Sequence, residues 1–516
     1  MSDPIVHLLT LFVAAVQPFF LLYFVLYNSY TLWLIALSAR PVRRRVVGHF
    51  IEELDRIGAE DLTKPVTIIL PARNEETSIL ENVTRLLNCD YPRFEVVVVT
   101  DGSADSTLER LKHGFQLRRT DVPYRPAIAT APVRALYRGT TDLPPGVLRL
   151  IVIDKENRGK ADARNAGINA STTPYVVSLD TCSIPDQRAL KKLMRVIQKD
   201  PRVIAVGGQV AIANGCMIHN GQVMSVGLPV GTLPRFQMVE YLRSTVARTG
   251  LDRVHATLKL SGIVVFQKEM VIRAGGYQTP FLRDRLSKEY GGRRVGTVGQ
   301  DMEIIVRLHR FVLDKLHDRR IAFLPHTVAW TEVPETFESL RKQRGRWYRG
   351  LRESLRNHRA MLGRAKFGPI GWFALPALWL FEYYGPVIEV AGYLLILFSL
   401  LMEWVLEQHF ISYEYLLGFL LASFGYGVLV NVLAMLVGAW PFRYGLADRL
   451  HGGLLPFNRR REVLILLLYA VLENFGYRQL TLYWRLRGLW DAWRGTTGRR
   501  KSGRVGFYPG DIPVHG

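Results

Sequence analysis

The hydrophobic residues of this chain follow two patterns, with short runs in the middle and long runs near both ends. Between residues 64 and 335 lie four short apolar runs: Val66–Leu70, Glu95–Thr100, Leu148–Ile153 and Tyr175–Leu179. Continuous runs of this length are expected of strands buried on both faces of a sheet. Between the first two runs, apolar residues recur on one helix face: Ile79, Val83, Leu86 and Leu87. The alternation predicts an α/β domain with a mostly parallel sheet covered by helices.

The long apolar runs predict membrane-spanning helices. Residues 4–39 are almost uninterrupted apolar and aromatic side chains, and about 20 residues suffice to cross a bilayer. We therefore expect Phe19–Ala39 to span, with residues 4–18 extending or preceding it. The run is too long for a signal peptide and lacks a basic start and a small-residue cleavage site. Two further spans are predicted at Pro386–Trp404 and Tyr415–Trp440.

Charges beside these runs predict their orientation. Arginines follow the first span at positions 40, 43, 44 and 45, and positive charge beside a span marks the cytoplasmic side. Residues 463–484 are apolar but include Glu473, Asn474 and Arg478, so they could span, form a re-entrant hairpin or lie at the interface. If they span, the Arg-rich stretch at 494–504 falls outside, against the charge rule. Residues 369–384, rich in Trp and Tyr, are predicted to be interfacial.

Composition narrows the function classes. The chain has 516 residues, and 67 Lys and Arg against 45 Asp and Glu give a formal charge of +22. Such an excess suits nucleic acid, an anionic membrane or phosphorylated substrates. The apolar runs favour the membrane, and we expect no nucleic-acid partner. The three cysteines, Cys89, Cys182 and Cys216, form no C-x-x-C pair, so neither a disulfide framework nor a zinc site is indicated.

Polar residues cluster where the predicted strands end. They are Arg73-Asn74-Glu75 after the first, Asp101-Gly102-Ser103 after the second, Asp154 through Lys160 after the third and Asp180 after the fourth. Ligands bind beyond the carboxyl ends of strands in such sheets. The Gly-x-Gly-x-x-Gly of dinucleotide folds is absent. We interpret residues 115–147, dotted with Pro and Arg, as an irregular surface insertion.

A further cluster, Gln343-x-x-Arg346-Trp347, lies between the α/β region and the last apolar runs. At helical spacing these three side chains share one side. Arginine binds phosphate oxygens and tryptophan offers a stacking face, so the set suits a charged ligand with a ring. The alternative is a basic amphipathic helix on lipid headgroups, which Arg341 and Lys342 would also serve.

The motifs together resemble family 2 glycosyltransferases, and among them the membrane-integrated synthases of cellulose, hyaluronan, chitin and poly-N-acetylglucosamine. The order that carries the resemblance is Pro71–Glu75, Thr100–Ser103, Asn157–Ala161, Ser178–Asp180, Leu260–Gly262, Gly275–Tyr277, Gly299–Asp301 and Gln343–Trp347. The resemblance implies a cytosolic GT-A domain, with a Rossmann-like, mostly parallel sheet, between transmembrane segments. The implied divisions are 1–45 (first span), 46–340 (GT-A domain), 341–385 (interfacial helices), 386–485 (C-terminal transmembrane region) and 486–516 (basic cytosolic tail).

The resemblance also assigns roles to single residues. Seven would bind the nucleotide sugar: Arg73, Glu75, Asp101, Lys160, Asp180, Gln343 and Arg346. Three would bind the acceptor: Ser261, Gly262 and Trp347. Asp301 matches the general base that deprotonates the acceptor hydroxyl. Each also has a purely structural interpretation: Asp101 could cap a helix at 105–111, Lys160 could be solvated, and Asp301 could be a first-turn helix charge.

A divalent cation, Mg²⁺ or Mn²⁺, is implied at Asp180, the first position of the family's Asp-x-Asp motif. Here the chain departs from the pattern, because Cys182 stands where the second carboxylate belongs. A thiol is a poor ligand for Mg²⁺, and Mn²⁺ tolerates softer ligands somewhat better. Either Asp180 holds the cation with phosphate and water, or Asp186 assists, or dependence on the metal is weakened.

The resemblance implies inverting transfer of a sugar, from a nucleotide sugar that we expect to be uridine-linked, to a growing glycan at the cytosolic membrane face. Polysaccharide synthesis coupled to export is the preferred interpretation, with glycan or lipid acceptor, membrane lipids and export subunits as partners and a bacterial inner membrane as location. A glycolipid-forming transferase and a catalytically weakened scaffold subunit are the alternatives. Cys182 and Gln300, both departures from the pattern, keep the scaffold open. Arg500-x-x-x-Arg504 could bind a cyclic dinucleotide, although so basic a tail produces that spacing readily by chance.

Overall fold

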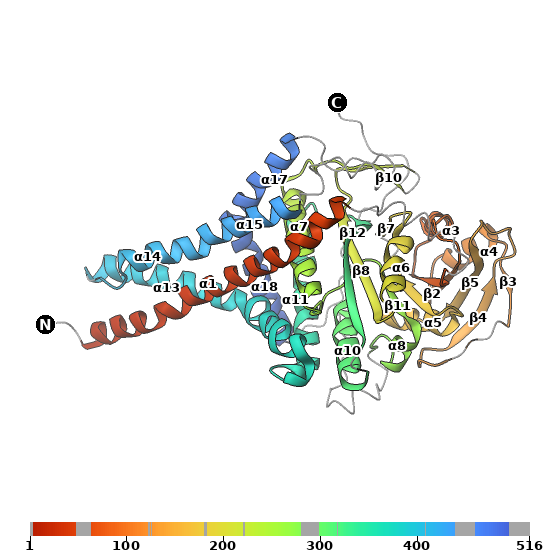
Figure 1. Ribbon diagram of the computed structural model, residues 1–516, viewed down its shortest axis with the longest axis horizontal. Helices are drawn as coiled ribbons and strands as arrows, with labels where there is room; N and C mark the ends of the chain where they lie inside the picture. The colour runs from red at the N-terminus through yellow and green to blue at the C-terminus, as the bar shows by residue number, and fades with distance from the viewer. Residues whose placement is uncertain are drawn as a thin grey trace.

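An α/β domain with long helices projecting from one side makes up the computed structural model (Figure 1). The structure describes residues 4–47, 63–121, 124, 126–179, 183–219, 222–279, 299–316, 318–407, 409–438 and 460–494. Asp180, Thr181, Cys182 and the two arginines at 500 and 504 lie outside the described residues.

The central sheet contains ten strands in the described part of the chain. In sheet order they are β3 (Arg118–Arg119), β4 (Val133–Arg138), β5 (Val147–Lys155), β2 (Phe94–Asp101), β1 (Val66–Ala72), β6 (Tyr175–Ser178), β11 (Val264–Gln267), β8 (Val203–Ile212), β12 (Arg320–Thr331) and β7 (Ser183–Pro185). The four strands from β5 to β6 are parallel. β12 is parallel to β8, whereas β11 runs antiparallel to both of its neighbours. The mostly parallel GT-A-type sheet predicted from the sequence is confirmed.

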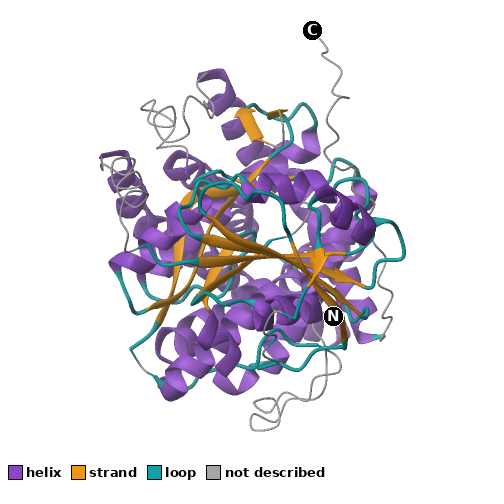
Figure 2. Cartoon of the chain, turned by 90° about the vertical axis from the view of Figure 1, so that its right-hand side faces the viewer, coloured by secondary structure: helices purple, strands orange, loops and turns teal. Residues whose placement is uncertain are grey.

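Helices cover both faces of this sheet, as Figure 2 shows. On one face, α3 (Ile79–Leu87), α4 (Thr107–Gly114) and α6 (Ala189–Lys199) pack on the strands. The other face carries α5 (Lys160–Ala170), α8 (Lys268–Arg273) and α10 (Gln300–Lys315). The four predicted strands appear as β1, β2, β5 and β6, and the predicted helix appears as α3 with its four apolar residues buried.

The prediction of an irregular insertion at 115–147 is wrong in part. β4 pairs antiparallel with β5, and β3 pairs with β4, which extends the sheet by two strands. β4 reads Val-Arg-Ala-Leu-Tyr-Arg and is only half-buried. A half-buried strand near the edge of a sheet tolerates arginine on its exposed positions, so β4 lacks the continuous apolar run that marks the central strands.

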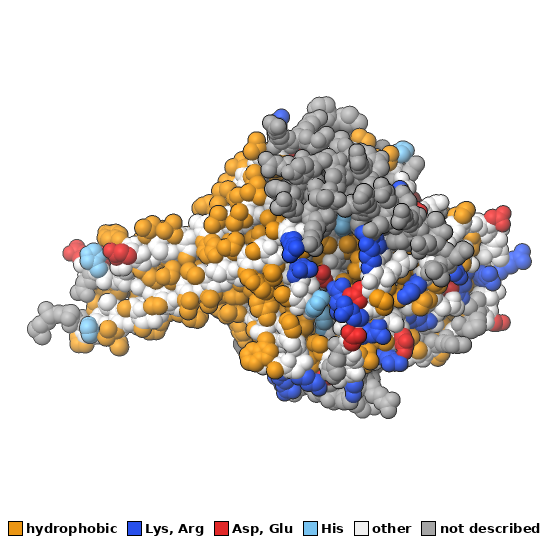
Figure 3. Space-filling view, viewed as in Figure 1, with side chains coloured by type: hydrophobic (Ala, Val, Ile, Leu, Met, Phe, Trp, Pro, Cys, Tyr) orange, Lys and Arg blue, Asp and Glu red, His pale blue; other side chains and the backbone are white. Residues whose placement is uncertain are grey.

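The three predicted spans appear as long apolar helices. They are α1 (Pro4–Val47), α13 (Gly385–Leu406), and α14 (Tyr413–Leu420) continued by the π-helical η5 (Leu421–Gly425) into α15 (Tyr426–Gly438). Residues 4–18 extend the first helix. By length and composition, four helices of the described chain could cross a membrane, the fourth at Arg461–Trp490. Apolar side chains cover the projecting helices in Figure 3, and charged ones lie mainly on the sheet domain.

Residues 463–484, for which the sequence left three arrangements open, form a broken helix. α17 (Arg460–Leu472) and α18 (Arg478–Trp493) are separated by η7 (Glu473–Tyr477), where Phe475 and Gly476 leave helical backbone geometry. In Figure 1 this pair crosses the base of the projecting helices, whereas α1, α13 and α15 point away from the sheet. It packs there against α7 (Thr232–Arg253) and α11 (Phe337–Asn357).

Ion pairs account for the polar residues of the broken helix. Glu473 accepts both terminal nitrogens of Arg243 at 2.7 Å, and Arg478 donates to Glu389 at 2.8 and 3.0 Å. Charges near a bilayer are tolerated when they are paired within the bundle. The pairs tie η7 and α18 to α7 and α13. The interfacial stretch at 369–384 is helical too, in η3 (Ile370–Ala374), α12 (Leu375–Ala377) and η4 (Leu378–Tyr383).

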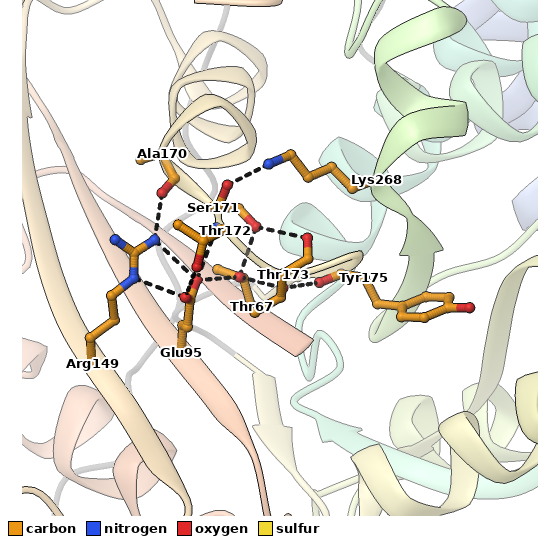
Figure 4. Close-up of polar contacts among 9 residues, drawn as sticks. All are labelled: Thr67, Glu95, Arg149, Ala170, Ser171, Thr172, Thr173, Tyr175 and Lys268. Carbon is orange, nitrogen blue, oxygen red and sulfur yellow. Dashed lines mark hydrogen bonds and ion pairs between the residues drawn. The ribbon is translucent and has the colours of Figure 1, made fainter. Parts of the chain in front are cut away.

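A buried polar network holds the starts of the parallel strands together (Figure 4). Glu95 of β2 accepts from Arg149 of β5 at 2.9 and 3.2 Å and from Thr67 of β1 at 2.7 Å. Thr172, beyond α5, donates to the same carboxylate. Burial alone would raise the pKa of Glu95, but the bonds from Arg149, Thr172 and Thr67 outweigh burial and lower that pKa.

We expect Glu95→Ala to destabilise the fold by about 3–5 kcal/mol, because it leaves the Arg149 cation without its buried partner. Since the folded pKa of Glu95 is lowered, its stabilisation is complete above the ordinary glutamate pKa and is lost as pH falls through the folded pKa. The melting temperature of the detergent-solubilised protein measures both effects. Glu109→Ala, which removes an exposed pair with Lys112, should change stability by no more than about 1 kcal/mol. Equal effects of the two variants would contradict the prediction.

Candidate functional site

The loops after β1 and β2 form one bonded unit at the carboxyl edge of the sheet. Asn74, in left-handed geometry at φ 53°, donates its N–H to Ser103 Oγ at 3.2 Å and accepts the N–H of Ala104 at 3.0 Å. The N–H of Glu75 donates to Thr107 Oγ1 at 2.9 Å. The predicted binding residues Arg73 and Glu75 therefore lie on a loop that is fixed against the end of β2.

Asp101 at the end of β2 organises the next loop. Its two carboxylate oxygens accept the N–H groups of Arg158 at 3.0 Å and Gly159 at 2.8 Å. Lys155, the last residue of β5, donates to the same carboxylate at 2.8 Å and lies 2.7 Å from Asp162 of α5. Asp101 thus bonds to the loop ahead of α5, and in the described part of the chain none of its side-chain hydrogen bonds goes to α4 (Thr107–Gly114), the helix that it could alternatively have capped.

Lys155 and Asp162 were not singled out from the sequence. The partial signal was the place of Lys155 two residues after a continuous apolar run, because a lysine that is buried there needs a charged partner. In the structure Lys155 has no exposed surface. It therefore acts by positioning the loop and the start of α5.

Glycine is required at position 102. Its φ is 60°, and a Cβ there would lie 2.8 Å from both the Cβ and the backbone nitrogen of Asn157. The loops after β2 and β5 thus touch backbone to backbone. Lys160, the predicted diphosphate ligand, is exposed at the first turn of α5 directly behind this contact. Helix starts and lysine both favour anionic ligands.

Asp301, the predicted base, lies in the first turn of α10 with a side chain 53 % exposed. Arg164 of α5 donates to its Oδ1 at 2.8 Å. The Arg164 guanidinium is buried and lies 4.8 Å from the centre of the Tyr277 ring. Asn165 in turn exchanges two hydrogen bonds with the backbone of Tyr277, at 2.7 and 2.8 Å. Sequence reasoning missed Arg164, which orients the carboxylate.

A second, fully buried pair anchors α10. Glu303 accepts from Arg307 at 2.8 and 2.9 Å and lies 3.3 Å from His358 Nε2, at the end of α11. Burial alone would raise the pKa of Glu303, but Arg307 and His358 lower it. Arg307 also donates to the carbonyls of Ala274 and Gly276. It thereby fixes the turn that carries Tyr277.

The Gln-x-x-Arg-Trp residues are confirmed as helical, within α11. A Cβ on Gly299 would lie 2.9 Å from the backbone of Gly350, so the start of α10 touches α11 directly. Arg346 lies one helical turn before Gly350 and Gln343 two turns before it, so both share the face of α11 that carries Gly350. Gln343 is buried and its Oε1 has no hydrogen-bond partner among the described residues.

Trp347 and Arg344 differ in exposure: the first is partly open to solvent and the second is buried in an ion pair. Trp347 is 45 % exposed, as a stacking surface requires. Arg344 is buried, forms an ion pair with Glu240 of α7 and lies 5.1 Å from the Trp347 ring. Tyr477 of η7 contributes a hydrogen bond to Glu240 at 3.3 Å. The structure thus gives Glu240 a role that its sequence context did not: it ties the predicted binding helix to α7 and to the broken helix.

The predicted acceptor residues Ser261 and Gly262 precede β11. Gly262 has φ 75°, and a Cβ there would lie 2.4 Å from Val210 Cγ2. Ser261 Oγ accepts a hydrogen bond from Arg248 of α7 at 3.0 Å. This pair therefore faces the helices at the base of the membrane segments.

The predicted metal ligand, Asp180, lies outside the described residues. Asp186, the possible second ligand, is ion-paired with Lys192 at 2.9 Å and accepts the N–H of Arg188 at 3.0 Å. Within the part of the chain that the structure describes, no three His, Cys, Asp or Glu side chains form a metal-binding group.

Comparisons with known proteins follow the same motifs. A "Glycosyltransferase like family 2" model matches residues 129–350, and a "Glycosyl transferase family 2" model matches residues 67–126. A poly-beta-1,6-N-acetyl-D-glucosamine synthase of Staphylococcus aureus is 24% identical over 314 residues, 60% of each chain. The Staphylococcus epidermidis synthase is 23% identical over 296 residues, 56% of this chain and 55% of the relative. The chain therefore spans less than two thirds of the length of these relatives.

Solved structures show weaker likeness. A mannosyltransferase of Pyrobaculum calidifontis, in complex with GDP-Man and Mn²⁺, has a TM-score of 0.43 and 18% identity over 90% of this chain and 99% of that one. A fragment of S. aureus TarS, in complex with UDP-GlcNAc, has a TM-score of 0.34 and 13% identity over 75% of this chain and 92% of that one.

We expect Lys155→Met to weaken nucleotide binding roughly tenfold or more, because two buried carboxylates would lose their shared cation and release the loop at 156–160. Titration of the full-length protein with a nucleoside diphosphate measures this loss, alongside the melting temperature. Lys366→Met removes a pair that is largely exposed on the lysine side and should leave nucleotide affinity unchanged. Wild-type affinity in a stably folded Lys155→Met variant would contradict the positioning role.

Proposed function

Because this chain belongs to glycosyltransferase family 2, we propose that it transfers a sugar from a nucleotide sugar, with inversion, to a hydroxyl of a glycan acceptor. The observation that supports this most directly is the Arg164–Asp301 pair at 2.8 Å beside the helix that carries Arg346 and Trp347. It supplies a half-exposed, oriented carboxylate next to groups suited to a diphosphate and to a sugar ring.

In the proposed reaction Asp301 accepts the proton of the attacking acceptor hydroxyl. The hydroxyl oxygen bonds to the anomeric carbon as the bond to the diphosphate breaks, so inversion needs no covalent nucleophile on the protein. Arg164 keeps the carboxylate oriented. Donor contacts are proposed for Arg73, Glu75, Asp101, Lys160, Gln343 and Arg346, and acceptor contacts for Ser261, Gly262 and Trp347.

We place a divalent cation at Asp180 in this proposal. When bound, Mg²⁺ or Mn²⁺ would offset the charge that develops on the leaving diphosphate. The positive side chains of Lys160 and Arg346 would also offset the charge on the leaving diphosphate. Because Asp180 is the single carboxylate at this position, the cation would need oxygens of the donor as further ligands. It would therefore bind together with the nucleotide.

Processive synthesis with export is the finer part of the proposal. The curated relatives are synthases of a polysaccharide by name, and the Trp347 helix is tied by Arg344 and Glu240 to α7 and the broken helix. An acceptor at Trp347 would therefore grow beside the membrane helices. We propose a uridine-linked donor, the cytosolic face of a bacterial inner membrane and, as partners, lipids and polysaccharide-export subunits.

The test is mass analysis of the products that the purified full-length protein makes from a panel of nucleotide sugars. A ladder of many sugar units, dependent on one uridine-linked donor and abolished by excess chelator, is the expected result. One discrete lipid-linked product would replace the synthase with a glycolipid-forming transferase. If no donor releases nucleoside diphosphate while nucleotide still binds, the chain is a scaffold subunit. Turnover that survives excess chelator would remove the cation from the proposal.

For the base, we expect Asp301→Asn to slow donor turnover by roughly 10²–10⁴-fold, because the amide cannot accept a proton. Nucleotide affinity should stay near the wild-type value. Asp314→Asn, at the opposite end of α10, serves as the control, because it changes a charge on the same helix without touching the site. If Asp301 were only a helix charge, Asp301→Asn would lower stability slightly and leave more than a tenth of the activity, which would contradict the base role.

A further inference from the structure

Arg248 of α7 carries a charge that the described chain does not balance. Its Nη1 donates to Ser261 Oγ at 3.0 Å, and its guanidinium lies 6.0 Å from the centre of the Phe323 ring. No ion pair joins Arg248 to a carboxylate among the described residues, whereas Arg243, on the same helix, has a bidentate pair with Glu473. A guanidinium keeps its charge under all ordinary conditions. Holding it half-buried without a counter-ion is unfavourable, so burial lowers the pKa of Arg248.

The groups around Arg248 add positive charge. Lys259, two residues before Ser261, forms an ion pair with Glu382 of η4. These two side chains are 32 % and 47 % exposed, so solvent and solutes reach them. Burial would raise the pKa of Glu382, but Lys259, Arg485 and Arg248 lower it. The direct ion pair of Glu382 is the one with Lys259, and Arg485 of α18 forms no hydrogen bond or ion pair in the part of the chain that the structure describes.

Aromatic rings of α11 and η4 pack together next to Glu382. The rings of Tyr348 and Tyr383 are stacked 6.0 Å apart, and Trp379 meets Tyr383 edge-on at 5.0 Å. The hydroxyl of Tyr348 donates to the carbonyl of Tyr383, which joins α11 to η4 beside Glu382. Tyr348 is buried in a hydrophobic cluster against which Trp379 and Tyr383 pack, so these rings hold η4 and its Glu382 against α11.

We propose that Arg248, Lys259 and Arg485 form a subsite for a carboxylate on the acceptor glycan, as in a uronic acid. The assignment rests on the proposed function, because it places the subsite at the acceptor residues Ser261 and Gly262. Arg248 would bind the carboxylate with the nitrogens that do not reach Ser261. The polymer named for the curated relatives is built from N-acetylglucosamine, which has no carboxylate, so this chain would differ from them in its acceptor.

The location favours a sugar carboxylate over a lipid phosphate. Ser261 accepts a hydrogen bond from Arg248, and Ser261 is one of the residues proposed to contact the acceptor. The Arg243–Glu473 pair lies on the same helix as Arg248 and is internally balanced. Of these two arginines of α7, the one without an ion pair among the described residues is therefore the one that contacts the proposed acceptor residue.

The experiment measures binding to the full-length protein in nanodiscs of a neutral lipid, with uridine diphosphate present. The probes are a tetrasaccharide ending in glucuronate and the same tetrasaccharide with that carboxylate reduced to the alcohol. The wild type should bind the charged probe at least several-fold more tightly, with the preference falling as salt rises. Arg248→Gln should weaken the charged probe roughly tenfold or more and the neutral probe by less than about twofold. Arg253→Gln, an exposed arginine farther along α7, is the matched control and should change neither.

Three results would overturn the subsite. They are equal wild-type affinity for the two probes, equal weakening of both by Arg248→Gln, and tighter Arg248-dependent binding of polyprenyl phosphate than of the glucuronate probe. If Arg248→Gln does not fold, Arg485→Gln takes its place with the same expected selectivity. Failure of the proposed function would appear separately, as absent donor turnover in the wild type, because the probe affinities need no turnover.

Discussion

The Lys155 ammonium, enclosed between Asp101 and Asp162 at 2.8 and 2.7 Å, fixes the geometry on which the candidate site depends. It joins the end of β2, the end of β5 and the start of α5. A buried cation of this kind is stable only with all of its partners in place. Once they are, the N–H groups of Arg158 and Gly159 are committed to Asp101. Lys160 and Arg164 are then set along one short helix, one toward the proposed donor and the other toward Asp301.

Contacts between residues far apart in sequence connect α5 to α10 and α10 to α11. Arg164 reaches Asp301, and the absence of a side chain on Gly299 lets the start of α10 touch α11 at Gly350. Glycine at such a point permits a backbone approach that any Cβ would prevent. The helix that carries Arg346 and Trp347 is thereby held against the start of the helix that carries Asp301.

The same α11 helix connects the site to the membrane segments. Arg344 is committed to Glu240 and lies against the ring of Trp347, whose side chain is itself 45 % exposed. At the base of the projecting helices most charges are paired, as in Arg243–Glu473 and Arg478–Glu389. Pairing makes these contacts structural. It also makes the unbalanced Arg248 and Arg485 stand apart as groups with capacity for a ligand.

The sequence by itself determined the parallel strands, the helix at 79–87, three long apolar helices and the helical Gln-x-x-Arg-Trp cluster, because burial imposes periods that can be read locally. It did not reveal β4, whose arginines hide an edge strand, or the break at Phe475–Gly476 that turns residues 463–484 across the base. Nor did it reveal which charges pair. Arg164 and Asp301 are 137 residues apart, and Arg344 and Glu240 are 104 apart. Only tertiary packing decides such partners, because a buried charge binds whichever opposite charge the fold brings within reach.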